Sequence, residues 1–293
     1  MKNAILALSL IAATTLPASA ALIHRWSFGN AAGAAPDGAV FTDSVGGADG
    51  IVRGANAAFT GTGLDLPGGS SATEAYGDLP NNLVSPHQAV TFEGWVTIDG
   101  GGNNWARIFD FGSTNPGGAN GEITGPGNTN GGGTDGLDYV FLSAARGGDY
   151  NLQRVEIRNE DPAGGGINTF DSGVVTTFPD SFHFAVSWQN IGGGQSQVDY
   201  WRDGVQLTTG AIANSTLQDL NDVNNWLGRS TWLNDGNLNA TYDEFRIWDS
   251  TVDQAYVDAA IAAGPNAVIP EPGTFGLFGL AGLTLILRRR RRR

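Results

Sequence analysis

The chain has 293 residues, and glycine (44) and proline (12) are abundant while charged residues make up only 15%. This composition favours strands and turns over a helical globule, and a hydrophobic content of 41% suffices for one large core and excludes wholesale disorder. The formal net charge is -13, and the lack of cysteine excludes disulfides, zinc-thiolate sites, iron-sulfur clusters and thiol catalysis.

Residues 1–20 have the layout of a secretory signal peptide. A basic start at Lys2 precedes an apolar run from Ile5 to Ala13, which Pro17 and two threonines then interrupt. Ala18-Ser19-Ala20 supplies the small residues of a cleavage site. We therefore predict cleavage after Ala20, rather than a buried N-terminal helix, and expect the mature domain to span residues 21–266.

Residues 21–248 show many short runs in which apolar and polar residues alternate, separated by clusters of Gly, Asn and Asp. In Ala89 to Ile98, for example, Val90 and Phe92 fall on one face of the expected strand, and Glu93 and Trp95 on the other. About a dozen such strands, without helical crossovers, predict an all-β fold: a two-sheet antiparallel jelly-roll sandwich of the concanavalin-A-like kind.

The sequence also predicts a hairpin turn, a long glycine-rich loop and one helix. Asp203-Gly204 is typical of a tight hairpin, because both central positions of such a turn need a positive φ. The segment from Gly112 to Gly136 holds ten glycines in 25 residues, which indicates a loop that is either functional or mobile. A C-terminal helix is expected after the last strand, from about Thr251 to Ala263, capped by Ser250 and ended by Gly264-Pro265.

The C-terminal residues 267–293 form a separate signal. Pro270-Glu271-Pro272 precedes a mostly apolar run from Thr274 to Leu287, and six arginines end the chain. A helix over this run would be only about 21 Å long, short of the roughly 30 Å of a bilayer core, so it is a marginal span.

This tail resembles the PEP-CTERM sorting signal of Gram-negative bacteria. The resemblance implies transient contact with the inner membrane, recognition of Pro270, Glu271 and Pro272 by an exosortase-type transpeptidase, and removal of the tail. It also implies delivery to the cell surface or the extracellular matrix. A permanent C-terminal anchor is the alternative.

Without both end segments the chain keeps 9 arginines, no lysine and 28 acidic residues, for a net charge of 9 - 28 = -19. Such a surface repels nucleic acid and anionic lipid. We therefore expect no nucleic-acid partner.

The strands carry a second resemblance, to the laminin-G-like jelly-roll domains of bacteria, over roughly residues 22–262. The segments that carry it, in chain order, are Trp26-Ser27-Phe28, Asp43 to Gly50, Gly63 to Leu66, Val90 to Val96, Phe182 to Trp188, Val198 to Trp201 with Asp203-Gly204, and Tyr242 to Trp248. The resemblance implies a polysaccharide or a glycoprotein as the partner class.

The sequence contains few catalytic patterns. It has neither Gly-x-Ser-x-Gly nor His-Glu-x-x-His, and its three histidines stand in separate segments. Glycosidases need two carboxylates close together, but adjacent Asp243 and Glu244 should point to opposite faces of a strand. Acids on different strands, such as Glu93 and Glu156, could still meet. We therefore predict no enzyme activity, with a polysaccharide-degrading hydrolase or lyase as the alternative.

Candidate ligand-binding residues are Trp95, Trp201 and Trp232, because exposed aromatic rings stack on the apolar faces of sugars. Trp95 and Trp201 lie opposite an apolar strand face, and Trp232 lies in a polar loop. The alternative for each is core or edge packing. Together with the partner class that the laminin-G-like resemblance implies, these observations lead us to expect a non-enzymatic carbohydrate- or glycoprotein-binding or structural module.

A structural calcium site is predicted at Asp243 and Asp43. Alternation places Asp243 on the same face as Phe245 and Ile247, so its carboxylate should point inward and need a cation or several donors. The turn from Asp43 to Gly50 could supply further oxygen ligands. The alternative is an aspartate that accepts backbone N–H groups without a metal.

Overall fold

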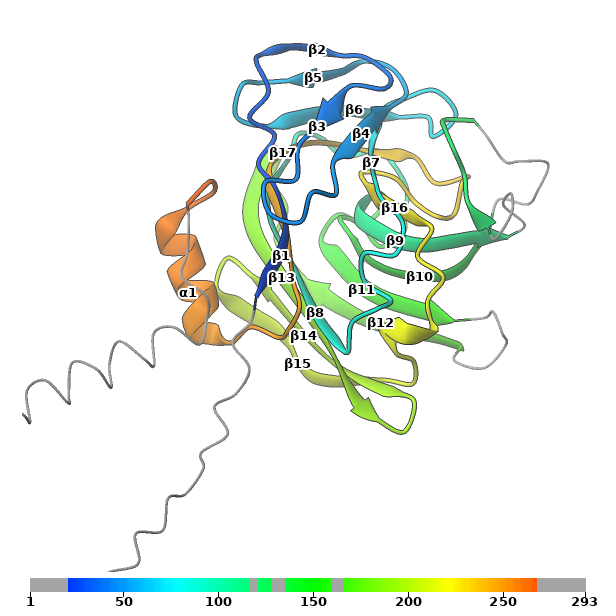
Figure 1. The fold of residues 1–293 in the computed structure, drawn as a ribbon, viewed down its shortest axis with the longest axis vertical. Helices are drawn as coiled ribbons and strands as arrows, with labels where there is room; N and C mark the ends of the chain where they lie inside the picture. Colours follow the sequence, from blue (N-terminus) through cyan, green and yellow to red (C-terminus); the bar gives the residue numbers. More distant parts are fainter. Residues whose placement is uncertain (1–20, 116–120, 128–134, 160–165, 268–293) are drawn as a thin grey trace, which may run out of the picture.

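Seventeen strands form two antiparallel sheets that pack face to face in the computed structural model (Figure 1), which describes residues 21–115, 121–127, 135–159 and 166–267. The predicted all-β jelly-roll sandwich with one C-terminal helix is confirmed. Both sheets have non-consecutive strands as neighbours, so each is assembled from distant parts of the chain.

The first sheet has nine strands. Their order is β15 (Val205–Ala213), β14 (Gln195–Arg202), β13 (Asp180–Gly192), β8 (Ala89–Ile98), β17 (Asn237–Trp248), β6 (Leu64–Gly69), β5 (Ala57–Phe59) and β2 (Gly33–Ala35). The remaining strand, β1 (Leu22–Trp26), also pairs with β17, with Trp26 opposite Phe245.

The second sheet has eight strands. Their order is β12 (Gly166–Gly173), β11 (Leu152–Asn159), β10 (Asp135–Ser143), β9 (Arg107–Asn115), β16 (Asn224–Leu227), β7 (Tyr76–Leu79), β4 (Gly50–Arg53) and β3 (Val40–Phe41). A short 3-10 helix (Leu217–Asp219) precedes β16.

The core lies between the sheets and consists of the apolar residues of the alternating runs. Val90 and Phe92 of β8 are fully buried there, and the Phe92 ring stacks on Phe109 of β9 with centroids 4.5 Å apart. The predicted hairpin is also confirmed: Asp203 (φ 47°) and Gly204 (φ 79°) alone connect β14 to β15.

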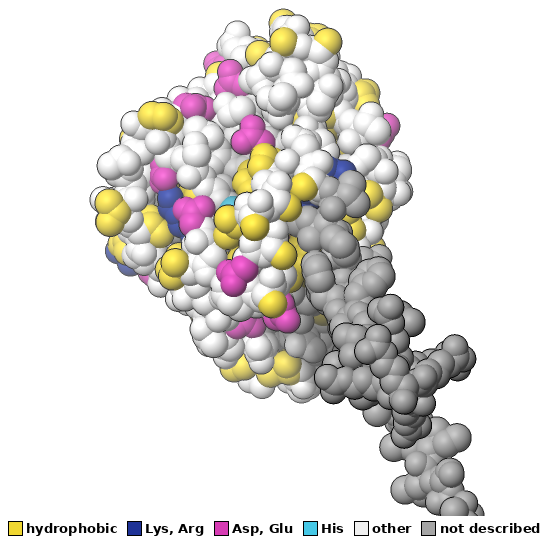
Figure 2. All heavy atoms as spheres, turned by 90° about the vertical axis from the view of Figure 1, so that its left-hand side faces the viewer, with side chains coloured by type: hydrophobic (Ala, Val, Ile, Leu, Met, Phe, Trp, Pro, Cys, Tyr) yellow, Lys and Arg dark blue, Asp and Glu magenta, His cyan; other side chains and the backbone are white. Residues whose placement is uncertain are grey.

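Helix α1 (Gln254–Ala263) follows the last strand and packs beside the first sheet (Figure 1). It begins three residues later than predicted, because the carboxylate of Asp253, rather than Ser250, accepts the free N–H of Tyr256 and caps it. Gly264 ends it as expected. Acidic side chains are spread over the face that carries α1, with little basic surface among them (Figure 2).

The glycine-rich segment is more ordered at its ends than predicted. β9 continues to Asn115 and β10 begins at Asp135, so both strands reach into the run of glycines. Within the described residues 121–127, Ile123 is buried in a small cluster with Tyr76, Trp226 and Leu233. The described residues 121–127 therefore cover part of the outer face of the second sheet.

Candidate functional site

A cavity of about 300 Å³ opens on the outer face of the second sheet, the face turned away from the core. It is lined by side chains from β9 to β12, from the loop before β9 and from the loop before β17: Trp105, Arg107, Tyr139, Phe141, Arg154, Glu156, Ile167, Trp232 and Asp235. Its volume is at the lower end of the range for ligand-binding pockets.

Strand alternation turns these side chains outward. In β11, Val155 points into the core while Arg154 and Glu156 on either side of it line the cavity. Phe141 of β10 lies opposite Glu156 on one side and Asp110 of β9 on the other. The register thus brings an aromatic ring and two carboxylates from three strands into one row.

Arg107 is held rigidly at the β9 side of the cavity. Its guanidinium lies 3.6 Å from the ring centroid of Phe141, and its Nη1 donates to the carbonyl oxygen of Trp105 at 2.8 Å. Nε donates to Asp110 Oδ2 at 3.3 Å, and Nη2 to Asp235 Oδ2 at 3.5 Å. This buried cation is therefore fixed by one ring and three acceptors.

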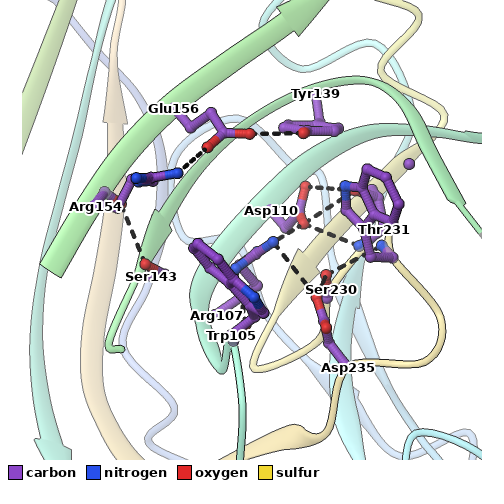
Figure 3. A network of polar contacts seen from close by, with 12 residues as sticks. Trp105, Arg107, Asp110, Tyr139, Ser143, Arg154, Glu156, Ser230, Thr231 and Asp235 are labelled. Carbon is purple, nitrogen blue, oxygen red and sulfur yellow. Dashed lines mark hydrogen bonds and ion pairs between the residues drawn. The ribbon is translucent and has the colours of Figure 1, made fainter. Parts of the chain in front are cut away.

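Glu156 is fixed on the β11 side. It accepts a hydrogen bond from the Tyr139 hydroxyl at 2.7 Å and one from Arg154 Nη1 at 3.1 Å (Figure 3). Arg154 also grips Asp171 with Nε (2.6 Å) and Nη2 (3.0 Å), and this contact lowers the pKa of Asp171. Burial, reinforced by Glu156, raises the pKa of Tyr139, so its hydroxyl stays protonated as a donor.

Asp110 differs from these carboxylates because it is fully buried. It accepts hydrogen bonds from the backbone N–H (2.9 Å) and the hydroxyl (3.1 Å) of Thr231. Burial raises the pKa of Asp110 to about 7, although Arg107 and Thr231 oppose the shift. The group that orients Arg107 therefore changes charge near neutral pH.

Two half-buried tryptophans flank the cavity. The Arg154 guanidinium lies 5.2 Å from the Trp105 ring, and that of Arg158 lies 5.0 Å from the Trp232 ring. Arg154 and Arg158 are four residues apart on β11, or about 13 Å at 3.3 Å per residue. Trp105 therefore lies beside the Arg154 end of β11, and Trp232 lies beside the Arg158 end.

Trp105 also has an unusual backbone. Its φ of 55° is rare for a bulky side chain, and such strain is of order 1–3 kcal/mol and concentrates at functional sites. Hydrogen bonds from its N–H to Gly147 O and from Arg107 to its carbonyl maintain this conformation. We did not predict Trp105 as a site residue, although an aromatic ring directly after Asn103-Asn104 in a glycine-rich loop was a usable signal.

Of the three predicted ligand-binding tryptophans, only Trp232 lines this cavity. The prediction that Trp95 and Trp201 are exposed is wrong: they are 9% and 3% exposed. Helix α1 covers them on the outer face of the first sheet, where Trp201 Nε1 donates to Gln254 Oε1 at 3.0 Å. Their positions opposite an apolar strand face could not reveal this cover, because α1 begins 53 residues after Trp201 and 159 residues after Trp95.

Beneath α1, Glu93 is a fully buried carboxylate with four donors. They are Tyr256 Oη (2.8 Å), Trp248 Nε1 (2.9 Å), His183 Nε2 (3.0 Å) and Arg246 Nη1 (3.5 Å). Burial alone would raise the pKa of Glu93, but His183 and Arg246 lower it overall. This network joins α1 to the first sheet and is closed to a large substrate. Glu93 lies on this sheet and Glu156 on the other, so the two acids do not form a pair.

The premise of the predicted calcium site is wrong for Asp243. A β-bulge between Tyr242 and Glu244 inserts one residue into β17, so Phe245 keeps its inward direction while Asp243 is only half-buried. Asp243 lines another cavity, of about 230 Å³, together with Trp95. Burial raises its pKa.

Asp43, the second residue of the predicted calcium site, accepts several hydrogen bonds. Its carboxylate accepts hydrogen bonds from His24 Nδ1 (2.7 Å) and from the backbone N–H groups of four residues, Arg25, Val45, Gly46 and Ala48. Burial would raise its pKa, but these donors hold it well below its usual range. Within the described residues, three or more His, Asp or Glu side chains do not gather into a metal site. Calcium binding stays a prediction.

The sequence profile of the PEP-CTERM protein-sorting motif matches residues 268–292. Pro270, Glu271 and Pro272 fall in this match and lie outside the described residues. The motif marks proteins that are exported and sorted to the cell surface in Gram-negative bacteria, so this chain carries that address. Among the helices of the described ranges, none is long and apolar enough to cross a membrane.

Solved structures with a similar fold come from carbohydrate-active proteins and a toxin. Domain 4 of an extracellular arabinanase from Geobacillus stearothermophilus, in complex with arabinotriose, has a TM-score of 0.55 at 17% identity, covering 82% of this chain and 98% of that domain. A Trypanosoma rangeli sialidase in complex with sialic acid has a TM-score of 0.53 at 15% identity, covering 81% of this chain and 32% of the sialidase.

Botulinum neurotoxin type C, described as interacting with two ganglioside molecules, has a TM-score of 0.53 at 14% identity, covering 82% of this chain and 50% of the toxin chain. This chain therefore corresponds to a whole arabinanase domain but to about a third of the sialidase. No curated protein sequence is significantly similar to it. At these identities the likeness shows the jelly-roll fold alone.

Proposed function

We propose that this exported protein is a non-enzymatic carbohydrate- or glycoprotein-binding module of the cell surface or extracellular matrix, and that the cavity on the second sheet is its glycan site. The observation that carries the proposal is the pair of half-buried rings, Trp105 and Trp232, on either side of polar groups held in fixed directions. A pyranose ring offers one apolar face to an aromatic ring and hydroxyls to its neighbours.

The polar groups suit hydroxyl recognition because donors and acceptors alternate. Arg107 and Arg154 supply guanidinium N–H groups, and Glu156 and Asp235 supply carboxylate oxygens. Since each is already held by its neighbours, binding a ligand orders few side chains. The laminin-G-like signature strands and the arabinotriose-bound domain of the same fold support a glycan as the ligand.

A hydrolase or lyase is the alternative, because arabinanase and sialidase are enzymes. Acid–base hydrolysis requires one carboxyl group to give up a proton and a second one to act as base or nucleophile. Here Glu156 accepts from Tyr139 and Arg154, and Asp235 accepts from Ser230 Oγ at 2.9 Å and from Arg107. These carboxylates serve as hydrogen-bond acceptors for a ligand and for their neighbours.

The route to this function includes removal of the C-terminal tail. We propose that an exosortase-type transpeptidase recognises Pro270-Glu271-Pro272 during a transient contact of the tail with the inner membrane. The mature domain then reaches the cell surface or matrix with its glycan cavity intact, because every residue that lines the cavity precedes the tail.

A glycan array probed with the exported protein tests the proposal. Trp105→Ala and Trp232→Ala should each weaken binding about tenfold, equivalent to about 1.4 kcal/mol. Phe178→Ala removes an exposed ring outside the cavity and should leave binding unchanged. Unchanged binding in both tryptophan variants would refute the site. Release of oligosaccharides that Glu156→Gln abolishes would establish the hydrolase instead.

A further inference from the structure

The first described residue, Ala21, is held by the last strand. Its backbone nitrogen donates to Asp249 Oδ1 at 2.8 Å, and its carbonyl oxygen accepts the Asp249 backbone N–H at 3.0 Å. The next residue, Leu22, lies opposite Trp248 in the pairing of β1 with β17. Ala21 and Asp249 therefore extend this pairing by one step, and both are half-buried.

Signal-peptide cleavage changes the chemistry of this nitrogen. Hydrolysis of the Ala20–Ala21 bond adds the oxygen of water to the Ala20 carbonyl carbon and hydrogen to the Ala21 nitrogen. The amide N–H, a neutral donor with one hydrogen, becomes an amino group that is mostly protonated at neutral pH. It then carries three hydrogens and a positive charge at the position that already donates to a carboxylate.

We propose that the α-ammonium group of mature Ala21 forms an ion pair with Asp249, so that N-terminal processing itself fastens β1 to β17 and stabilises the exported domain. The inference rests on cleavage after Ala20 and is independent of glycan binding. Charge-assisted hydrogen bonds are roughly twice as strong as neutral ones, and partial burial protects the pair from screening by salt. The precursor, which has an amide at this position, lacks this contribution.

The sequence makes the group unusually easy to probe. Lys2 is the only lysine of the chain and lies in the predicted signal peptide. Residues 21–293 contain no lysine, so after cleavage the α-amino group of Ala21 is the single primary amine in this part of the sequence. An amine-selective reagent modifies that one atom and no other.

The first experiment measures the reactivity of this amine in the exported protein. Its N-terminus is established by mass spectrometry, and it is then acetylated with an N-hydroxysuccinimide ester at pH 7. The ion pair lowers the unprotonated, reactive fraction, tenfold for each unit by which it raises the pKa of the amino group. Asp249→Asn should therefore react several-fold faster than wild type. Asp258→Asn, with the same charge change on the exposed face of α1, should match wild type.

The second experiment compares thermal unfolding before and after acetylation. The midpoint should fall in wild type and stay unchanged in Asp249→Asn, because only wild type has an ion pair to lose. Inserting one glycine between Ala20 and Ala21 moves the ammonium by about 3.5 Å and should lower the midpoint in the same way. The glycine-insertion variant tests the ion pair even if the Asp249→Asn variant does not fold.

Two results would overturn the proposal. One is an exported protein that does not begin at Ala21, which also removes the cleavage prediction while leaving the glycan site untouched. The other is equal reactivity of the amine in wild type and Asp249→Asn together with a midpoint that acetylation does not change.

Discussion

Replacing Asp110 with asparagine should change how the stability of the domain depends on pH. Asp110 is fully buried, and its pKa is raised from 3.8 to about 7. In the unfolded chain it titrates near 4, so between about pH 4 and 7 only the folded state binds this proton. The free energy of unfolding therefore decreases as pH rises through this window, by up to about 1.4 kcal/mol per pH unit.

The size of the effect follows from the shift of about 3 pKa units, which corresponds to about 4 kcal/mol between pH 4 and pH 8. Urea unfolding at pH values from 4 to 8 measures it. Asp110→Asn carries no titrating group and should show a shallower pH slope than wild type, whereas the exposed control Asp258→Asn should keep the wild-type slope. Equal slopes in wild type and Asp110→Asn would refute this account of the Asp110 carboxyl group.

Three further outcomes are expected. Trp201→Ala should lower the free energy of unfolding by about 3–5 kcal/mol and the unfolding midpoint by on the order of 6–20 °C. It should leave glycan affinity unchanged, because α1 covers this ring. A variant that loses glycan affinity but keeps the wild-type stability would contradict this prediction. Intact mass of the exported protein should correspond to a chain that begins at Ala21 and lacks Arg288–Arg293, and retention of the arginine tail would favour a permanent anchor. The calcium hypothesis predicts a higher unfolding midpoint with calcium than with chelator, and loss of that difference in Asp243→Ala; an unchanged midpoint in wild type removes it.

Local patterns predicted the architecture well. Val90 and Phe92 are in the core, and Asp203-Gly204 forms its hairpin, because side-chain alternation and positive φ depend only on neighbouring residues. The prediction that the Asp243 side chain points into the core was wrong, although its cause is also a local feature of the strand. A single-residue bulge reverses the alternation after it, and nothing in the sequence of β17 marks the bulge.

Among the ligand-binding residues that the sequence predicted, only Trp232 lines the cavity on the second sheet. The other residues around it come from strands and loops that are far apart in the sequence, and their meeting depends on strand order and register. Arg107 and Glu156, for example, are 49 residues apart, and only the pairing of β9, β10 and β11 places both beside Phe141. In the sequence alone, Arg107 and Glu156 each look like an ordinary polar residue on a strand.

The sequence by itself determined the fold class and the C-terminal sorting signal, because alternation, turn residues and sorting motifs are properties of short contiguous segments. The N-terminal signal peptide stays a prediction. Only the tertiary structure decided which tryptophans are accessible and which carboxylates are buried. Exposure depends on what covers a residue: α1 covers Trp201, whereas Trp105 and Trp232 line a cavity among the described residues. Burial in turn sets the charge of a group such as Asp110, because removing a carboxylate from water favours its neutral form.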